Sequence, residues 1–169
     1  MTTKQKKTCN PKRKGNAAEL ELSKLFSKHF GLPFARVGVA SGARVKNTKL
    51  PDSAIGVMTG DLIVPHSFRF SVECKAVNID IDFLAPSALF DKWLVQAKDD
   101  ARSIHKTPLL CWKRHRKGWI AAVPLYAFVT TATPYPLCFV MYRSWAVTKL
   151  DTLLGIYRPA FWFMDEEDG

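Results

Sequence analysis

The sequence predicts an α/β or α+β domain in which a mixed β-sheet is flanked by helices. Two observations predict this class. Apolar residues recur at helical spacing in two separate segments, and strand-like runs bounded by turn residues follow each of them. The order helix, strands, helix, strands is typical of such a layered domain. The chain has 169 residues, and 47% of them are hydrophobic, which is enough to bury the core of one domain and excludes disorder over the full length.

The first helix is predicted over Ala17–Phe30. Its apolar positions recur every three or four residues: Ala18, Leu22, Leu25, Phe26 and Phe30. Asn16, which follows Gly15, is suited to cap the N-terminus of this helix, and Gly31 is suited to close it. Residues 1–14 contain six basic and no acidic side chains, so we expect them to form a flexible basic arm.

Residues 31–59 are rich in Gly, Ser, Lys and Asn, with a short strand expected around Phe34–Val39. So long a connection in a compact domain is usually functional or mobile. Two strands are predicted next, over Asp61–Val64 and Phe70–Val77. The Pro-His-Ser sequence at 65–67 between them is typical of a turn, so the two strands are expected to form a hairpin.

The second half of the predicted domain, which spans residues 15–164, begins with a helix over Ser87–His105. Its expected buried stripe is Leu89, Trp93, Ala97, Ala101 and Ile104. Strands are predicted at Leu109–Trp112 and Trp119–Val123, on either side of a basic turn. A further strand is expected within 134–142 and a short helix within 148–156, ahead of an acidic tail at 165–169.

The net charge of +10 is concentrated at the N-terminal end of the sequence. Residues 1–50 hold 12 Lys and Arg and 2 acidic residues, which leaves 13 basic and 13 acidic residues in 51–169. Nucleic acid is the commonest partner of such a basic segment, although a solubilising tail is the alternative. The sequence contains no secretory signal, no membrane-spanning run and no cysteine spacing typical of zinc, which favours the reducing cytoplasm.

The residues that indicate chemistry are three charged side chains in the two strands after the loop. Glu73 and Lys75 alternate along one strand, so they share a face, and hairpin pairing would bring Asp61 beside Glu73. Two adjacent carboxylates repel each other unless a cation lies between them, and Mg²⁺, or Mn²⁺ in its place, prefers such oxygen ligands. The alternative is an ordinary Glu–Lys pair on a solvated sheet face.

This pattern resembles the PD-(D/E)XK nuclease superfamily, in which an Asp precedes a hairpin and an acid-x-Lys triplet lies on its second strand. Gly60 stands where that superfamily usually has proline. The segment Arg13–Leu22 resembles the opening of the archaeal-type Holliday junction resolvases, whose first Glu corresponds to Glu19. Helical spacing independently places Glu19 beside the buried stripe, while a local capping box with Asn16 is the alternative.

The resemblance implies a restriction-endonuclease-like fold and Mg²⁺-dependent hydrolysis of DNA phosphodiesters. Glu19, Asp61 and Glu73 would hold the metal, and Lys75 would position the attacking water. Gln96, on the following helix, would lie near the metal or the phosphate, unless it is an ordinary surface residue. The implied protein is a homodimer that cuts four-way junctions, in phage or viral replication as well as in archaea, and in the host cytoplasm if it is viral.

Two other functions remain open at this point. The first is a different DNA endonuclease on the same fold, such as a restriction-like, nicking or repair enzyme, because substrate choice lies in loops. The second is a basic DNA-binding protein without catalysis. The candidate phosphate contacts are basic or hydroxyl side chains of the arm, the long loop and the later basic turn: Lys12, Arg13, Lys14, Ser41, Arg44, Lys46, Lys113, Arg114, Arg116 and Lys117.

Overall fold

The computed structural model describes residues 11–37, 57–77, 81–83, 85–114, 118–129, 138–155 and 159–164. The strands are β1 (Ala35–Arg36), β2 (Val57–Thr59), β3 (Leu62–Val64), β4 (Phe70–Ala76), β5 (Thr107–Arg114), β6 (Gly118–Pro124), β7 (Val140–Tyr142) and β8 (Trp145–Lys149). The helices are α1 (Pro11–Phe30), α3 (Ala88–Ser103), α4 (Tyr126–Val129), α5 (Leu150–Leu154) and α6 (Pro159–Trp162). None of the helices in these ranges is long and apolar enough to cross a membrane.

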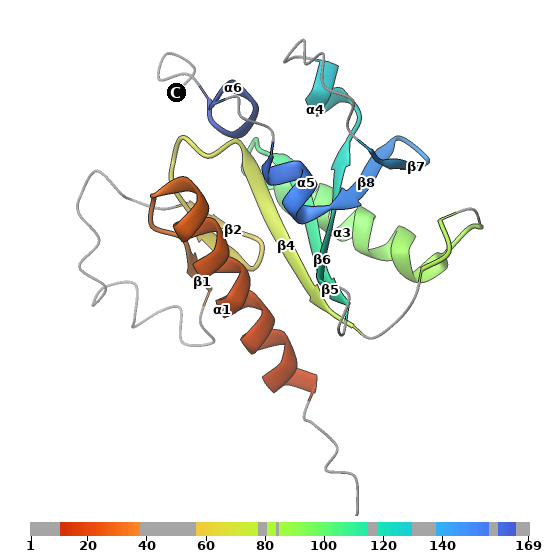
Figure 1. Cartoon of the computed structure of the whole chain (residues 1–169), viewed down its shortest axis with the longest axis horizontal. Coiled ribbons are helices and arrows are strands. Elements are labelled where there is room, and N and C mark those ends of the chain that lie inside the picture. The colour runs from red at the N-terminus through yellow and green to blue at the C-terminus, as the bar shows by residue number, and fades with distance from the viewer. Residues whose placement is uncertain are drawn as a thin grey trace, which may run out of the picture.

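The strands form a five-stranded sheet in the order β4-β5-β6-β8-β7 and a three-stranded sheet in the order β1-β3-β2 (Figure 1). Strands β4 and β5 are parallel, with Glu73 opposite Leu110, and the other pairs of the larger sheet are antiparallel. Parallel strands need a long crossover, and α3 supplies it between β4 and β5. The predicted mixed sheet flanked by helices is confirmed.

Helices cover both faces of the larger sheet (Figure 1). On one face, α1 packs Leu22 and Phe26 against Val72 of β4, together with side chains from α5 and α6. On the other face, α3 packs Phe90 and Trp93 against alternate residues of β5 and β6. Because Val72 and Cys74 point toward α1, the alternate residues of β4 point toward α3. Glu73 and Lys75 therefore lie between the sheet and α3.

Helix α1 begins at Pro11 and not at Ala17 as predicted, so residues 11–14 form its first turn and are not part of an arm. Proline suits the first turn of a helix because its missing N–H would have no partner there. Asn16 consequently lies inside the helix and is not its N-cap. At the other end, the backbone N–H of Gly31 donates to Ser27 O (3.0 Å) at φ 68°, which confirms the predicted glycine closure.

The predicted hairpin between β3 and β4 is wrong. Strand β3 lies in the middle of the smaller sheet, so β1 and β2 already occupy both of its hydrogen-bonding edges. A single parallel bridge between Gly60 and Val72, with Asp61 N donating to Val72 O (3.0 Å), joins this region to β4 instead. The pairing differs from the prediction, but Asp61 still lies beside β4.

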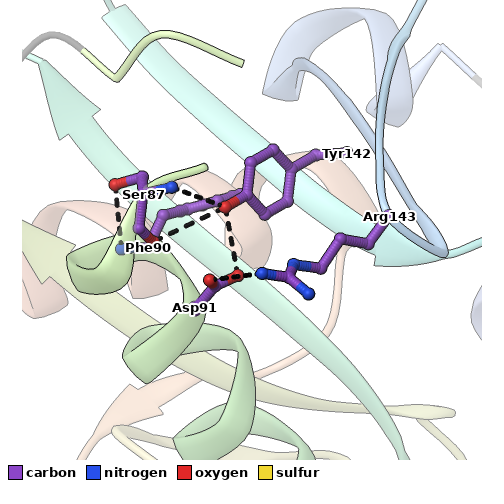
Figure 2. Close-up of polar contacts among 5 residues, drawn as sticks. All are labelled: Ser87, Phe90, Asp91, Tyr142 and Arg143. Carbon is purple, nitrogen blue, oxygen red and sulfur yellow. Dashed lines mark hydrogen bonds and ion pairs between the residues drawn. The ribbon is translucent and has the colours of Figure 1, made fainter. Parts of the chain in front are cut away.

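Helix α3 matches the predicted helix to within two residues at each end. Ser87 caps it by accepting a hydrogen bond from Phe90 N (3.3 Å). Its buried stripe is shifted from the prediction, because Leu89 is exposed whereas Phe90 and Leu94 are buried. Figure 2 shows how β7 fixes this end of the helix: the Tyr142 hydroxyl donates to Asp91 (3.0 Å), and Arg143 pairs with the other oxygen of Asp91 (2.7 Å).

The last third of the chain was predicted least well. The β5–β6 hairpin, the strand at β7 and the short helix α5 are confirmed, but β8, α4 and α6 were not predicted. Strand β8 pairs with β7 in a tight antiparallel hairpin and with β6, which ends more than 20 residues earlier in the chain. The pairing with β6 is a contact between distant segments, which local pattern does not reveal. Residues 1–10 of the predicted arm and the acidic tail at 165–169 lie outside the described residues.

Candidate active site

Glu73, Lys75 and Gln96 form an interlocked polar group between β4 and α3. The Lys75 ammonium pairs with Glu73 Oε1, and it also donates to Gln96 Oε1 (3.0 Å). Gln96 Nε2 in turn donates to Glu73 Oε1 (2.8 Å). The Glu73 side chain is only 3% exposed and that of Lys75 is 21% exposed, so the pairing is partly buried and is not a fully solvated surface contact. The structure thus brings Gln96 to the acid and the lysine of the predicted motif.

Asp61 joins this group from the end of the smaller sheet. Its Oδ2 accepts a hydrogen bond from the backbone N–H of Cys74 (2.8 Å), which lies between Glu73 and Lys75 in β4. Its own backbone carbonyl accepts from Val37 N (3.0 Å), which fixes the residue to the segment after β1. The carboxylate is therefore held against the backbone of the strand that carries Glu73.

Gly60 makes this close approach possible. It has φ 56°, and a Cβ atom at this position would lie 2.6 Å from Val72 O and 3.4 Å from Glu73 Oε2. Proline, the usual residue of the superfamily here, has its φ fixed near −65° and could not adopt this conformation. The departure from the motif is thus matched by a local backbone that requires glycine.

Replacing Gly60 with alanine is expected to cost more stability than the same change at Gly31. Both residues have positive φ, so both variants carry the left-handed penalty of about 1 kcal/mol. A Cβ at Gly31 meets no described atom within 4 Å, whereas at Gly60 it would collide with the β4 backbone. We expect Gly60→Ala to lower the free energy of unfolding by roughly 2 kcal/mol more than Gly31→Ala, measured by urea denaturation. Equal losses would contradict the close approach.

Glu19 approaches the same group from α1. Arg36 of β1 donates to it from Nε (3.3 Å to Oε2), and the side chains are 17% (Glu19) and 27% (Arg36) exposed. The alternative capping-box role for Glu19 is wrong, because Asn16 lies within α1. The contact with Arg36 was not predicted, because a single arginine in a short strand does not by itself indicate a site residue.

The three carboxyl groups all have raised pKa values. Burial is the largest cause at each, and it raises the pKa of Glu73 to about 7. The negative charge of Asp61 is the second cause at both Glu19 and Glu73, whereas Lys75 lowers all three pKa values. The carboxylates therefore repel one another even though a lysine lies among them, and a further positive charge would relieve this repulsion.

A cleft of about 340 Å³ opens beside this group. It is lined by Gly60, Asp61, Glu73, Gln96, Asp100, Ser103 and Ile104. Asp100 was missed by sequence reasoning, although it follows Gln96 by four residues and therefore shares its helix face. Its negative charge also contributes to the raised pKa values of Asp61 and Glu73.

The oxygen ligands on the β-strand wall fit a hydrated divalent cation. Among the described residues, no three His, Cys, Asp or Glu side chains converge as they would in a closed metal site. Mg²⁺ is usually held by one or two carboxylates and keeps several water molecules. The paired carboxylates of Asp61 and Glu73 beside an open cleft match that requirement, with Glu19 close enough to be affected by Asp61.

The candidate DNA contacts fall into three groups. Lys12, Arg13 and Lys14 are exposed on the first turn of α1, and Lys113 and Arg114 end β5. The remaining candidates lie outside the described residues: Ser41, Arg44, Lys46, Arg116 and Lys117.

Lys113 is not a free cation, because it pairs with Glu21 of α1, which also accepts from Trp119 Nε1 (3.1 Å). This contact joins the β5–β6 hairpin to the helix that carries Glu19.

Comparisons with known proteins give a family for this chain. A family model described as "Phage putative PDDEXK endonuclease" matches residues 10–154. Among solved structures, the chain is similar to Hjc, a Holliday junction resolvase from the archaeal hyperthermophile Archaeoglobus fulgidus. The two chains are 15% identical with a TM-score of 0.41, and the similarity covers 82% of this chain and 90% of that chain. No curated protein gives a significant match.

Proposed function

The chain belongs to the phage PDDEXK endonuclease family, and we propose that within it the protein is a Mg²⁺-dependent DNA endonuclease that cuts branched junctions. Membership confirms the resemblance to PD-(D/E)XK nucleases on which the sequence interpretation rested. It makes the protein a nuclease, with DNA as the substrate that the family implies. The metal, the branched substrate and the oligomeric state belong to the proposal.

One arrangement of side chains carries the proposal. The buried Glu73 contacts Lys75 and Gln96, and the Asp61 carboxylate is hydrogen-bonded to the backbone of β4, the strand that carries Glu73. Asp61 and Glu73 would hold the cation. Glu19 would supply a third carboxylate from α1, although it does not converge with the other two in this structure. A bound divalent cation polarises a phosphodiester and lowers the pKa of a water molecule.

The side chains around the carboxylates would do the remaining work. Lys75 would orient the attacking water and stabilise negative charge that develops on the phosphate. Gln96 bonds to both Glu73 and Lys75, so it fixes their relative orientation. Arg36 holds Glu19 on the α1 side of the site through one of its nitrogens.

A branched substrate is supported by the sequence of α1 and by the distribution of charge. The Arg13–Leu22 segment resembles the junction resolvases, and its basic side chains are exposed one to two turns before Glu19. Basic side chains that contact phosphates confer affinity without sequence information, which suits an enzyme that recognises DNA shape.

A homodimer is proposed because a four-way junction has two symmetry-related scissile phosphates, which a twofold pair of sites can reach together. The C-terminal third is the proposed dimer surface. In its described part, Phe139 and the β7 residues Val140 and Met141 expose apolar side chains at an edge of the larger sheet.

The proposal is tested by offering the purified protein a labelled four-way junction, the matched linear duplex and a single strand, each with Mg²⁺. We expect paired, symmetric nicks in the junction alone, abolished in Asp61→Asn and retained in Asp99→Asn, whose side chain is exposed. Equal cutting of the duplex would favour another endonuclease of the superfamily. Tight binding without cutting under any divalent metal would favour the non-catalytic DNA-binding alternative.

A further inference from the structure

Asp100 is an acidic side chain of the cleft for which the proposed chemistry has no role. It lies one helical turn after Gln96 on α3, so the helix wall of the cleft carries Gln96 and Asp100 while the strand wall carries Asp61 and Glu73. Gln96 reaches across to Glu73 (2.8 Å), which shows how closely this face of α3 approaches β4. Asp100 is partly buried in this position.

The charges around the cleft do not balance. Glu19 and Arg36 cancel each other, and Lys75 cancels one of the three carboxylates of Asp61, Glu73 and Asp100. The remainder is two negative charges when all three are ionised, which one divalent cation would neutralise. None of the ion pairs formed within the described ranges includes Asp100. Its carboxylate is therefore available to a positively charged or hydrogen-bond-donating ligand in the cleft.

We propose that Asp100 is a positioning residue of the cation site, whose carboxylate accepts hydrogen bonds from water molecules of a cation held by Asp61 and Glu73. This inference rests on the proposed function. A Mg²⁺ or Mn²⁺ ion with few protein ligands keeps several water molecules, and groups that bind such outer ligands typically change metal affinity 10- to 100-fold.

The adjacent residue Asp99 provides a matched control. It lies in the same turn of α3, equally close to the C-terminal end of the helix, but it is exposed and does not line the cleft. An effect of removing negative charge near the helix end would therefore appear in both Asp99→Asn and Asp100→Asn. An effect through the cleft would appear only in the second variant.

The test is the affinity of the full-length protein for Mn²⁺, without DNA, measured by titration calorimetry and by the electron paramagnetic resonance signal of free Mn²⁺. We expect Asp100→Asn to bind about 10-fold more weakly than wild type, which is the lower end of the range for outer ligands. Asp99→Asn should differ by less than about twofold, and Asp100→Glu, which keeps the carboxylate, should retain most of the affinity. Asp61→Asn should lose more affinity than any of these.

The outcomes separate this inference from the function on which it rests. If Asp100→Asn binds like Asp99→Asn while Asp61→Asn loses affinity, the role of Asp100 is refuted and the cation site stands. If Asp61→Asn also binds like wild type, the proposed cation site itself fails. Thermal unfolding of Asp100→Asn should be unchanged or shifted upward, because a like charge is removed. A downward shift, with Asp100→Glu binding equally weakly, would indicate a structural role and overturn the proposal.

Discussion

Glu73→Gln is expected to abolish cleavage and, at the same time, to stabilise the cation-free protein. Loss of a proposed metal ligand should reduce the rate of cleavage by roughly 10³-fold, the scale of one preorganised electrostatic group. The gain in stability follows from burial, because the charged carboxylate is almost fully shielded from water beside Asp61. A site that binds a cation would thus be a source of instability when the cation is absent.

The pKa of Glu73 determines how the stability difference between wild type and Glu73→Gln changes with pH. The pKa of Glu73 is raised from 4.5 to about 7, so between these values the folded state binds more protons than the unfolded state. Wild-type stability should therefore fall as the pH rises through this window, and glutamine, which does not titrate, should not show this fall. At pH 8 we expect Glu73→Gln to be more stable by on the order of 3 kcal/mol, and below pH 4.5 the two proteins should differ little.

Denaturant unfolding at pH 4, 6 and 8 without divalent metal measures the difference. Adding Mg²⁺ should then stabilise the wild type, since a ligand that binds the folded state raises its stability, and should leave the variant unchanged. Asp99→Asn serves as the control for a generic loss of negative charge. If Glu73→Gln were less stable than wild type at pH 8, the charged Glu73 side chain would stabilise the folded protein, which would contradict this prediction.

The parts of the site that the sequence predicted are those defined by local rules. Alternation along a strand placed Glu73 and Lys75 on one face, and helical spacing placed Glu19 at the border of the buried stripe. Gln96 was named from the resemblance, and the structure brings it to both residues of the motif. The placements of Glu73, Lys75 and Glu19 needed only the residue order within one element, whereas Gln96 needed the resemblance as well.

The parts that were missed depend on contacts between elements. The hairpin prediction failed because β3 is paired on both edges. One neighbour is β1, which lies within the strand expected around Phe34–Val39, and the other is β2, which was not predicted. Asp100 was missed because its proximity to Glu73 depends on how α3 crosses the sheet. Arg36 was missed because it contacts Glu19 only through the packing of β1 against α1. Likewise Leu89 and Phe90 are neighbours in sequence, and only the packing of α3 decides which is buried.

Phe68→Ala is expected to have the largest effect on stability. Phe68 lies between β3 and β4, is fully buried and is surrounded by six aromatic rings. Their centroids lie 5.0–6.1 Å from that of Phe68. The rings come from α1, β4, α6 and the residues that follow the two helices: Phe26, Phe30, Phe34, Phe70, Trp162 and Phe163. Truncation would leave a cavity at the point where these elements meet.

The expected loss is about 3–5 kcal/mol, the range for removing a buried aromatic ring, against a total stability of roughly 5–15 kcal/mol for a domain. Phe163→Ala is the matched control, because Phe163 packs on the same ring but is only partly buried, and it should cost about 1–2 kcal/mol. Urea unfolding of the two variants tests the difference, and equal losses would refute a central role for Phe68.

Because β4 carries Glu73 and also contacts α3, a Phe68→Ala protein that remains folded at low temperature should still bind Mn²⁺. The aromatic group would then support the fold that holds the site, while the polar residues facing α3 supply its chemistry.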